Sequence, residues 1–269
     1  MTIFQAIVLG IVQGATEFIP VSSSGHLLLV PWLLGWSPPG LTFTIFAHLG
    51  TAFGVLINLW DEWLATLTST FRWLRTRETD DTVRLVGLLL IGLVPAVVVG
   101  LLFSDFFERV FTQPLVAASM LLVSAAFLVI GERIGKLKRG MTDMTWKDAL
   151  FIGVAQAFAI FPGVSRSGAT IAAARTRHFK REDAARYSFM LLMPIVFGVS
   201  LLTSVDLVRQ GITLAGLEVL LAAFFSALIS AVLVMRWLLN FLRTRSTTVF
   251  AVYCVVAALF CLIVFFVRG

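Results

Sequence analysis

One short segment of this chain occurs twice, and the second copy follows the first at a distance of 143 residues. Residues 10–25 align without a gap on residues 153–168, and seven of the sixteen aligned pairs are identical. Both copies place Gly, Pro and Ser in the middle of an apolar stretch, a composition that interrupts a helix. Because the distance is about half of the chain, the sequence indicates an internal duplication with one broken helix in each half.

The composition of the chain indicates whether it folds in water or in a membrane. The 269 residues are 59% hydrophobic and only 13% charged, whereas soluble domains are about a quarter charged. Residues 249–267 contain no charged side chain, and this length is enough to cross the hydrocarbon core as a helix. The strands of a transmembrane β-barrel would instead show apolar and polar residues in alternation, in shorter segments. The sequence therefore predicts a helical bundle in a membrane.

The apolar stretches divide into continuous and interrupted ones. Six continuous stretches predict spanning helices at residues 41–60, 83–103, 114–131, 187–206, 217–237 and 249–267. Two others, residues 3–35 and 148–177, are broken at their midpoints. Irregular backbone at membrane depth is tolerated only where protein or a wet cavity satisfies it. We therefore expect two re-entrant helix–loop–helix pairs, with a pair of true spans as the alternative for each.

The order of these segments predicts the fold class. Residues 1–269 form one membrane domain, with repeat halves at residues 1–135 and 145–269. Each half holds one re-entrant pair followed by three spans. Three is an odd number, so the second half enters the membrane from the opposite side. We expect an all-α polytopic membrane protein with six transmembrane helices and two re-entrant helix–loop–helix pairs in an inverted-topology repeat.

Basic residues predict the orientation. One set of loops carries most of them, at Arg72, Arg75, Arg77, residues 133–186, Arg243 and Arg245. The opposite set carries only Arg109, Arg209 and Arg268. Cytoplasmic loops are enriched in Lys and Arg, so the first set is expected in the cytoplasm and both termini outside. The net charge of +6 then reflects loops that face anionic lipid, and no nucleic-acid partner is expected.

The first copy of the repeat carries an acid, a serine cluster and an imidazole. Gln13 and Glu17 are four residues apart and share a helix face. A carboxylate at membrane depth is costly and indicates function, the alternative being a structural hydrogen bond to the backbone at the break. The following residues, Ser22, Ser23, Ser24, Gly25 and His26, can present hydroxyl and N–H groups to phosphate oxygens. His26 lies three residues after Ser23, and because Glu17 and the serine cluster are beside it we expect a catalytic role, with a packed polar group as the alternative.

The second copy carries a guanidinium where the first carries a hydroxyl. Arg166 is a natural fork for a phosphate group, and a salt bridge to Glu17 that joins the two halves is the alternative. The predicted phosphate-binding residues around it are Ser165, Ser167, Gly168 and Thr170. His48 lies within the first predicted span and can line the same cavity. The two copies together predict a site for a phosphate ester or anhydride.

These motifs resemble a known family. The segments Gln13-Gly-Ala-Thr-Glu-Phe-Ile-Pro-Val-Ser-Ser-Ser-Gly-His26 and Pro162-Gly-Val-Ser-Arg-Ser-Gly-Ala-Thr170 are similar to the two signature motifs of the undecaprenyl-diphosphatases, also called bacitracin-resistance proteins. The likeness extends to Leu49-Gly50 and to Tyr187-Ser-Phe-Met-Leu-Leu-Met-Pro194, and it covers essentially the whole chain. It implies an enzyme that removes the terminal phosphate from undecaprenyl diphosphate and so recycles the lipid carrier for cell-wall synthesis.

The resemblance also implies a multi-pass protein of the inner (plasma) membrane, a homodimer, and help from Mg²⁺ or Ca²⁺. The family's acidic motif has Glu or Gln at its first position, and this chain has Gln13, so a metal site would rest on Glu17 with Gln13. The charge asymmetry predicts a site that opens to the outer, periplasmic side.

The sequence is compatible with three nucleophiles: Ser23 activated by His26, His26 itself, and a water molecule activated by Glu17. Inverted repeats with broken helices also occur in transporters, so a flippase for phosphorylated polyprenol lipids is the competing class.

Overall fold

The computed structural model of the chain describes residues 1–103, 106, 110, 112–210 and 214–268, with residues 201–210 and 214–215 described as backbone only. Within these residues the protein is helical, with eleven α-helices, a 3₁₀ turn and one isolated bridge between Arg139 and Phe179. The helices are α1 (Ile3–Thr16), α2 (Ser23–Leu34), α3 (Leu41–Asn58), α4 (Trp60–Thr76), α5 (Asp81–Leu102), α7 (Pro114–Ile134), η1 (Met141–Asp143), α8 (Trp146–Phe158), α9 (Arg166–Thr176), α10 (Arg181–Gln210), α11 (Leu214–Thr244) and α12 (Thr248–Arg268).

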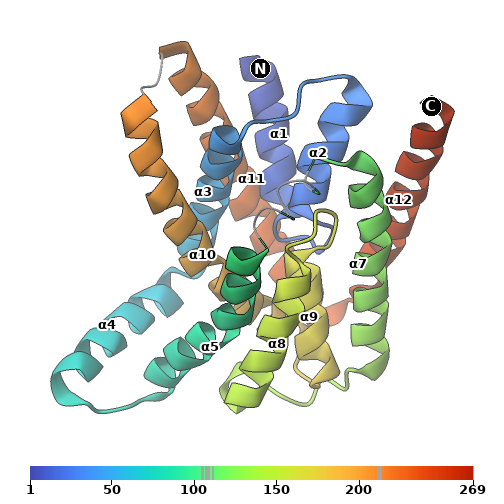
Figure 1. Cartoon of the computed structure of the whole chain (residues 1–269). Helices are drawn as coiled ribbons and strands as arrows, with labels where there is room; N and C mark the ends of the chain where they lie inside the picture. The colour runs from blue at the N-terminus through green and yellow to red at the C-terminus, as the bar shows by residue number, and fades with distance from the viewer. Residues whose placement is uncertain (104–105, 107–109, 111, 211–213, 269) are drawn as a thin grey trace.

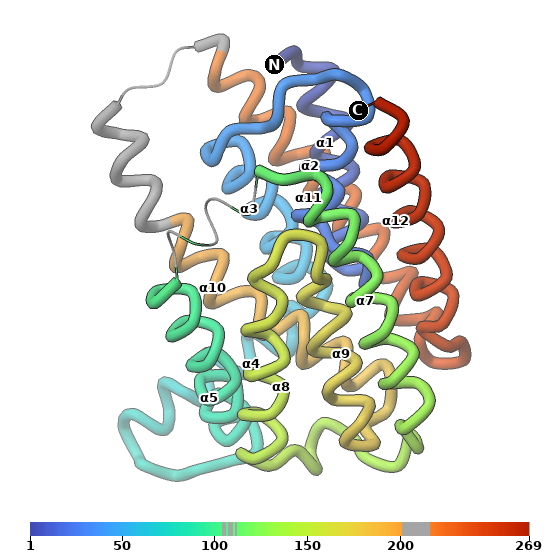
Figure 2. Tube along the Cα trace, turned by 45° about the vertical axis from the view of Figure 1, so that its right-hand side comes forward, coloured from blue at the N-terminus to red at the C-terminus, as the bar shows by residue number. Residues whose placement is uncertain are grey.

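Both interrupted segments are helix–break–helix units. A capping box between Thr2 and Gln5 starts α1, and a second one between Thr145 and Asp148 starts α8. The chain breaks at residues 17–22 and 159–165, and α2 and α9 then begin. Figure 1 shows α1 and α2 entering from one end of the molecule and α8 and α9 from the other, and the rotated view in Figure 2 agrees. The two breaks therefore face each other inside the bundle.

Five of the described helices, α3, α5, α7, α12 and α11 from Gly216 onward, are long and apolar enough to cross a membrane. They match the predicted spans at 41–60, 83–103, 114–131, 249–267 and 217–237. The remaining predicted span, 187–206, falls within α10, and the side chains of its last residues lie outside the described part of the chain. Arg109 and the side chain of Arg209, used above for orientation, also lie outside it.

Close helix packing surrounds the first break. α1 and α3 both pack against α11, and glycines stand at the contacts. A Cβ atom at Gly14 would lie 2.4 Å from the Ala227 carbonyl oxygen, and one at Gly50 would lie 2.4 Å from the Phe224 carbonyl oxygen. Small residues allow this approach, and lipid gives no hydrophobic force that would draw the helices together otherwise. Glycine packing thus fixes the position of α1 and its C-terminal break.

Helix α4 is an element that the sequence did not predict. The first span was expected to run to residue 60, but α3 ends at Asn58 and a separate helix follows. The buried residues of α4 are Thr66 and Ser69, while large apolar side chains such as Leu67 and Phe71 are exposed. In a soluble amphipathic helix the apolar residues would be buried and the polar ones exposed, so α4 shows the opposite arrangement. The arginines near the end of α4 are also typical of a loop.

An ion cluster holds the start of α8. Asp148 is fully buried and accepts hydrogen bonds from Arg139 (2.6 Å), Arg177 (2.8 Å) and Thr145 (2.7 Å). Burial raises the pKa of this carboxyl, but the two guanidinium groups and the Thr145 bonds outweigh it and hold the pKa well below its usual range. These contacts join the α7–α8 linker, α8 and the end of α9.

Candidate active site

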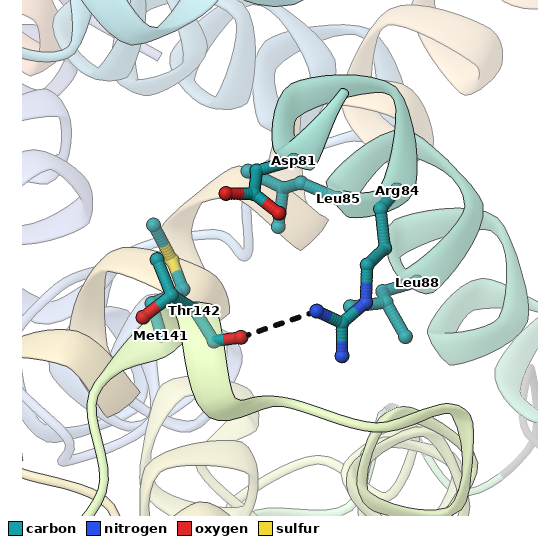
Figure 3. A pocket seen from close by; sticks show the side chains of 6 residues that line it. All are labelled: Asp81, Arg84, Leu85, Leu88, Met141 and Thr142. Carbon is teal, nitrogen blue, oxygen red and sulfur yellow. Dashed lines mark hydrogen bonds between the residues drawn. The ribbon is translucent and has the colours of Figure 1, made fainter. Parts of the chain in front are cut away.

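A cavity of about 990 Å³ opens where the two breaks face each other. Glu17 and Ser22–Ser24 line it from the first break, and residues 164–167 line it from the second. Apolar side chains of α2 and α10, among them Leu27, Leu28, Leu192 and Ile195, form much of the remaining wall. A second pocket, drawn in Figure 3, has only about 50 Å³ and lies near η1, where Arg84 donates to the Thr142 carbonyl. The larger cavity is therefore the candidate site.

An ion pair between the two halves lies at the wall of this cavity. Arg166 Nη2 donates to Glu17 Oε1, and only 4% of the Glu17 side chain is exposed. The salt bridge that the sequence left as an alternative is thus formed. Arg166 Nη1 is buried and has no hydrogen-bond partner among the described residues. A buried donor of this kind fits an acceptor oxygen that arrives with a ligand.

The second carboxylate oxygen of Glu17 contacts three further polar side chains. Glu17 Oε2 accepts from Gln13 Nε2 at 2.7 Å and from Ser23 Oγ at 2.6 Å. The shared helix face of Gln13 and Glu17 is confirmed. His48 Nε2 lies 3.5 Å from the same oxygen, and its Nδ1 donates to the Thr44 carbonyl at 2.8 Å. From the sequence, His48 was expected only to line the cavity, because nothing in its spacing places it beside a carboxylate on another helix.

Two serines that the repeat shares are helix caps. Ser22 Oγ accepts from the Gly25 N–H at 3.2 Å, and Ser165 Oγ accepts from the Gly168 N–H at 3.0 Å. An N-terminal cap satisfies one of the free N–H groups of a helix. The partial positive ends of α2 and α9 are thereby held at the cavity beside Arg166, which favours an anion there.

The remaining predicted phosphate ligands are placed in two ways. Ser24 and Ser167 line the cavity, each with its hydroxyl near that of the capping serine of its own copy. Gly25, Gly168 and Thr170 are not among the described residues that line it. Thr170 Oγ1 donates to the Arg166 carbonyl at 2.8 Å, inside its own helix. Their part in phosphate binding stays a prediction.

His26 lies near the predicted serine but is bonded elsewhere. α2 begins at Ser23, and His26 follows in its first turn. Its Nδ1 is 2.8 Å from the Ser22 carbonyl oxygen, and its Nε2 is 2.8 Å from the Tyr253 hydroxyl of α12. His26 is not among the described residues of the cavity wall, and the hydroxyl of Ser23 bonds to Glu17 instead. Activation of Ser23 by His26 is thus not the arrangement observed.

The donors at the breaks do not form a metal site by themselves. Ca²⁺ takes six to eight oxygen ligands, many of them from carboxylates and carbonyls, whereas Mg²⁺ keeps several waters and is held by one or two carboxylates together with substrate phosphates. The described residues contain no cluster of three or more His, Cys, Asp or Glu. Glu17 is the carboxylate at the break, and the Arg166 guanidinium already neutralises it. The Gln13 Oε1 atom is buried with no hydrogen-bond partner in the described part of the chain, but one amide oxygen and one paired carboxylate do not fit a dication that is held without substrate.

Fold and site together define a multi-pass helical membrane protein with a buried polar site inside its bundle. The cavity combines a guanidinium, a carboxylate and hydroxyls with an apolar wall. The chain belongs to the family described as Bacitracin resistance protein BacA, whose model matches residues 6–260.

Curated relatives agree with this family. The chain is 41% identical to the undecaprenyl-diphosphatase of Pelotomaculum thermopropionicum over 96% of its own length and 95% of the relative. It is 39% identical to the one of Desulforudis audaxviator over the full length of both chains. For the one of Gloeobacter violaceus the identity is 42%, over 93% of this chain and 88% of the relative.

Proposed function

We propose that this chain is an integral membrane phosphatase that hydrolyses undecaprenyl diphosphate to the monophosphate and phosphate, which recycles the lipid carrier for cell-wall synthesis. The observation that carries the proposal is the Arg166–Glu17 pair, with Ser23 on the same carboxylate, at the wall of a large cavity. The polar part suits a diphosphate and the apolar wall suits an isoprenoid chain. The family and the names of its relatives supply the identity of the lipid.

The chemistry that this arrangement supports is attack by Ser23. Its Oγ loses a proton to Glu17 Oε2 and bonds to the terminal phosphorus, while the bond from that phosphorus to the bridging oxygen breaks and undecaprenyl monophosphate leaves. Water then releases phosphate from the serine, and the proton held by Glu17 returns to Ser23. Arg166 and the N-termini of α2 and α9 stabilise the charge on the phosphoryl oxygens. A water activated by Glu17 in a single step is the alternative.

The inverted-topology repeat of six spans and two re-entrant pairs, with halves 1–135 and 145–269, is part of the proposal. Its support is a matching set of packing partners: α1 packs against α11, and its counterpart α8 packs against α5. The aligned glycines Gly10 and Gly153 stand at these contacts. In addition, Phe53 in the first span of one half and Phe197 in the first span of the other, each followed by Gly-Val, have ring centroids 5.8 Å apart.

The proposed location is the inner (plasma) membrane, with the site open to the outer, periplasmic side. In Figure 1 the α4–α5 and α7–α8 connections, which carry many of the basic residues, lie at one end of the molecule and both termini at the other. The positive-inside rule assigns the first end to the cytoplasm. A homodimer remains a proposal drawn from the family resemblance, to be checked by light scattering in detergent.

Mg²⁺ or Ca²⁺ is proposed only as an ion that accompanies the substrate phosphates, since the protein donors do not build a site for it. Phosphate release measured with EDTA and then with each added cation tests this. A cation requirement that persists at saturating substrate, together with cation binding in the absence of diphosphate, contradicts it.

The experiment for the function is phosphate release from a long-chain polyprenyl diphosphate by the purified protein in detergent, with Glu17→Ala as the matched inactive variant. We expect the unsubstituted protein to release phosphate and the Glu17→Ala variant to release none above background. No release under any cation condition contradicts the proposal and favours the flippase, which lipid translocation in proteoliposomes then tests.

A further inference from the structure

Tyr253 reaches the first break from the other end of the chain. It lies on α12, and its hydroxyl is 2.8 Å from His26 Nε2. The two rings are nearly parallel, with centroids 5.8 Å apart and planes 15° apart. Nothing in the repeat motifs involves Tyr253, because α12 follows the first copy by more than two hundred residues.

The direction of the hydrogen bonds follows from their acceptors. A carbonyl oxygen only accepts, so the Nδ1 atom of His26 carries a proton that it donates to the Ser22 carbonyl. In the neutral ring Nε2 is then an acceptor, and the hydroxyl of Tyr253 donates to it. Both nitrogens are thus held, and the ring forms a bridge between α12 and the break.

The bridge ends on a strained residue. Ser22 has φ +72°, a region in which a residue with a side chain is uncommon. Its carbonyl accepts from both the His26 ring and, at 3.1 Å, the His26 backbone N–H. That carbonyl belongs to the same peptide plane as the N–H of Ser23, whose Oγ donates to Glu17. Holding the plane therefore holds the backbone from which the Ser23 side chain projects toward Glu17.

We propose that Tyr253 is a positioning residue that acts through His26 and the Ser22 carbonyl to aim the Ser23 hydroxyl at Glu17. The inference rests on the proposed phosphatase function. His26 is in this arrangement a positioning residue as well, and neither of its ring nitrogens meets the substrate. Strain at a functional site persists only where surrounding contacts hold it, and this chain of contacts supplies them.

The test compares the two tyrosines of the chain. Tyr253→Phe removes only the hydroxyl that bonds His26, and Tyr187→Phe removes only the hydroxyl that bonds the Leu88 carbonyl, outside the cavity wall. We expect Tyr253→Phe to lower kcat for polyprenyl diphosphate roughly three- to tenfold at unchanged KM, the size of one lost neutral hydrogen bond. Tyr187→Phe should lower the melting temperature and leave kcat unchanged.

Two variants of His26 separate positioning from chemistry. The side-chain amide of His26→Asn can lie where Nδ1 lies and donate to the Ser22 carbonyl, whereas that of His26→Gln extends to the position of Nε2. We expect His26→Asn to retain at least tenfold more kcat than His26→Gln. Added to His26→Ala, Tyr253→Phe should change kcat by less than twofold, because the bridge is already broken.

The outcomes are distinct. An unchanged kcat in Tyr253→Phe overturns the inference, and so does background activity in both His26→Asn and His26→Gln with intact folding, because His26 would then take part in the chemistry. Either result leaves the phosphatase itself standing. A natural chain that releases no phosphate overturns the proposed function and this inference together.

Discussion

Replacing Arg166 by lysine tests whether the fork or only the charge of this residue is needed. The guanidinium holds Glu17 through Nη2 and leaves Nη1 buried without a partner among the described residues. A planar fork can serve Glu17 and a phosphoryl oxygen at once, but the single ammonium of lysine cannot take both positions in one plane. Arg166→Lys therefore keeps the charge and loses one charge-assisted hydrogen bond.

The size of the effect follows from that one bond. A hydrogen bond to a charged group contributes about 1.5–3 kcal/mol, so kcat/KM should fall roughly ten- to 150-fold in Arg166→Lys. Arg166→Ala removes the charge as well and should cost roughly 10²–10³-fold or more, as does the loss of an oxyanion donor. It also leaves Glu17 buried and unpaired, so a lower melting temperature is expected for the alanine variant.

The assay is phosphate release over a range of polyprenyl diphosphate concentrations, with thermal unfolding in the same detergent. Arg243→Lys is the matched control, because Arg243 pairs with Glu182 at an exposed position away from the cavity. It should leave kcat/KM unchanged. If Arg166→Lys keeps the natural kcat/KM while Arg166→Ala loses it, the charge alone suffices and the fork argument is wrong.

Three further predictions concern the nucleophile, the ion cluster and the second break. Ser23→Ala should lower kcat about 10³-fold or more if Ser23 is the nucleophile, and residual activity above a tenth points to a water activated by Glu17. Asp148→Asn should reduce the free energy of unfolding by about 2–4 kcal/mol in chemical denaturation at pH 7. Because the folded pKa of Asp148 is lowered, its contribution is present above the ordinary carboxyl pKa and declines as pH falls toward the folded value, so the difference between the variants should shrink in acid. Gly163→Ala should destabilise by about 2 kcal/mol or more, since Gly163 has φ +92° and a Cβ would lie 2.1 Å from the Ala117 carbonyl, whereas Gly87→Ala, with open space around it, should change stability by less than about 1 kcal/mol.

The parts of the fold that could be predicted are those fixed by local signals. Apolar length predicted the five described helices that can cross a membrane, and the Gly, Pro and Ser residues of each copy predicted that the two other apolar segments are broken at their midpoints. Caps and helix starts depend on residues within one turn, so they can be read along the chain. α4 was missed because its buried residues, Thr66 and Ser69, are polar while large apolar side chains such as Leu67 and Phe71 are exposed, which reverses the usual pattern.

The sequence by itself determined that two broken apolar segments carry Glu17 in one copy and Arg166 in the other, because these types at membrane depth are costly unless they are paired. Only the tertiary structure decided which atoms meet. It joined Ser23 to Glu17, brought His48 beside the same carboxylate, and turned His26 toward Tyr253. These partners lie on different helices, and which faces of those helices meet depends on close packing at glycines such as Gly14 and Gly50. Spacing along the chain does not contain that information.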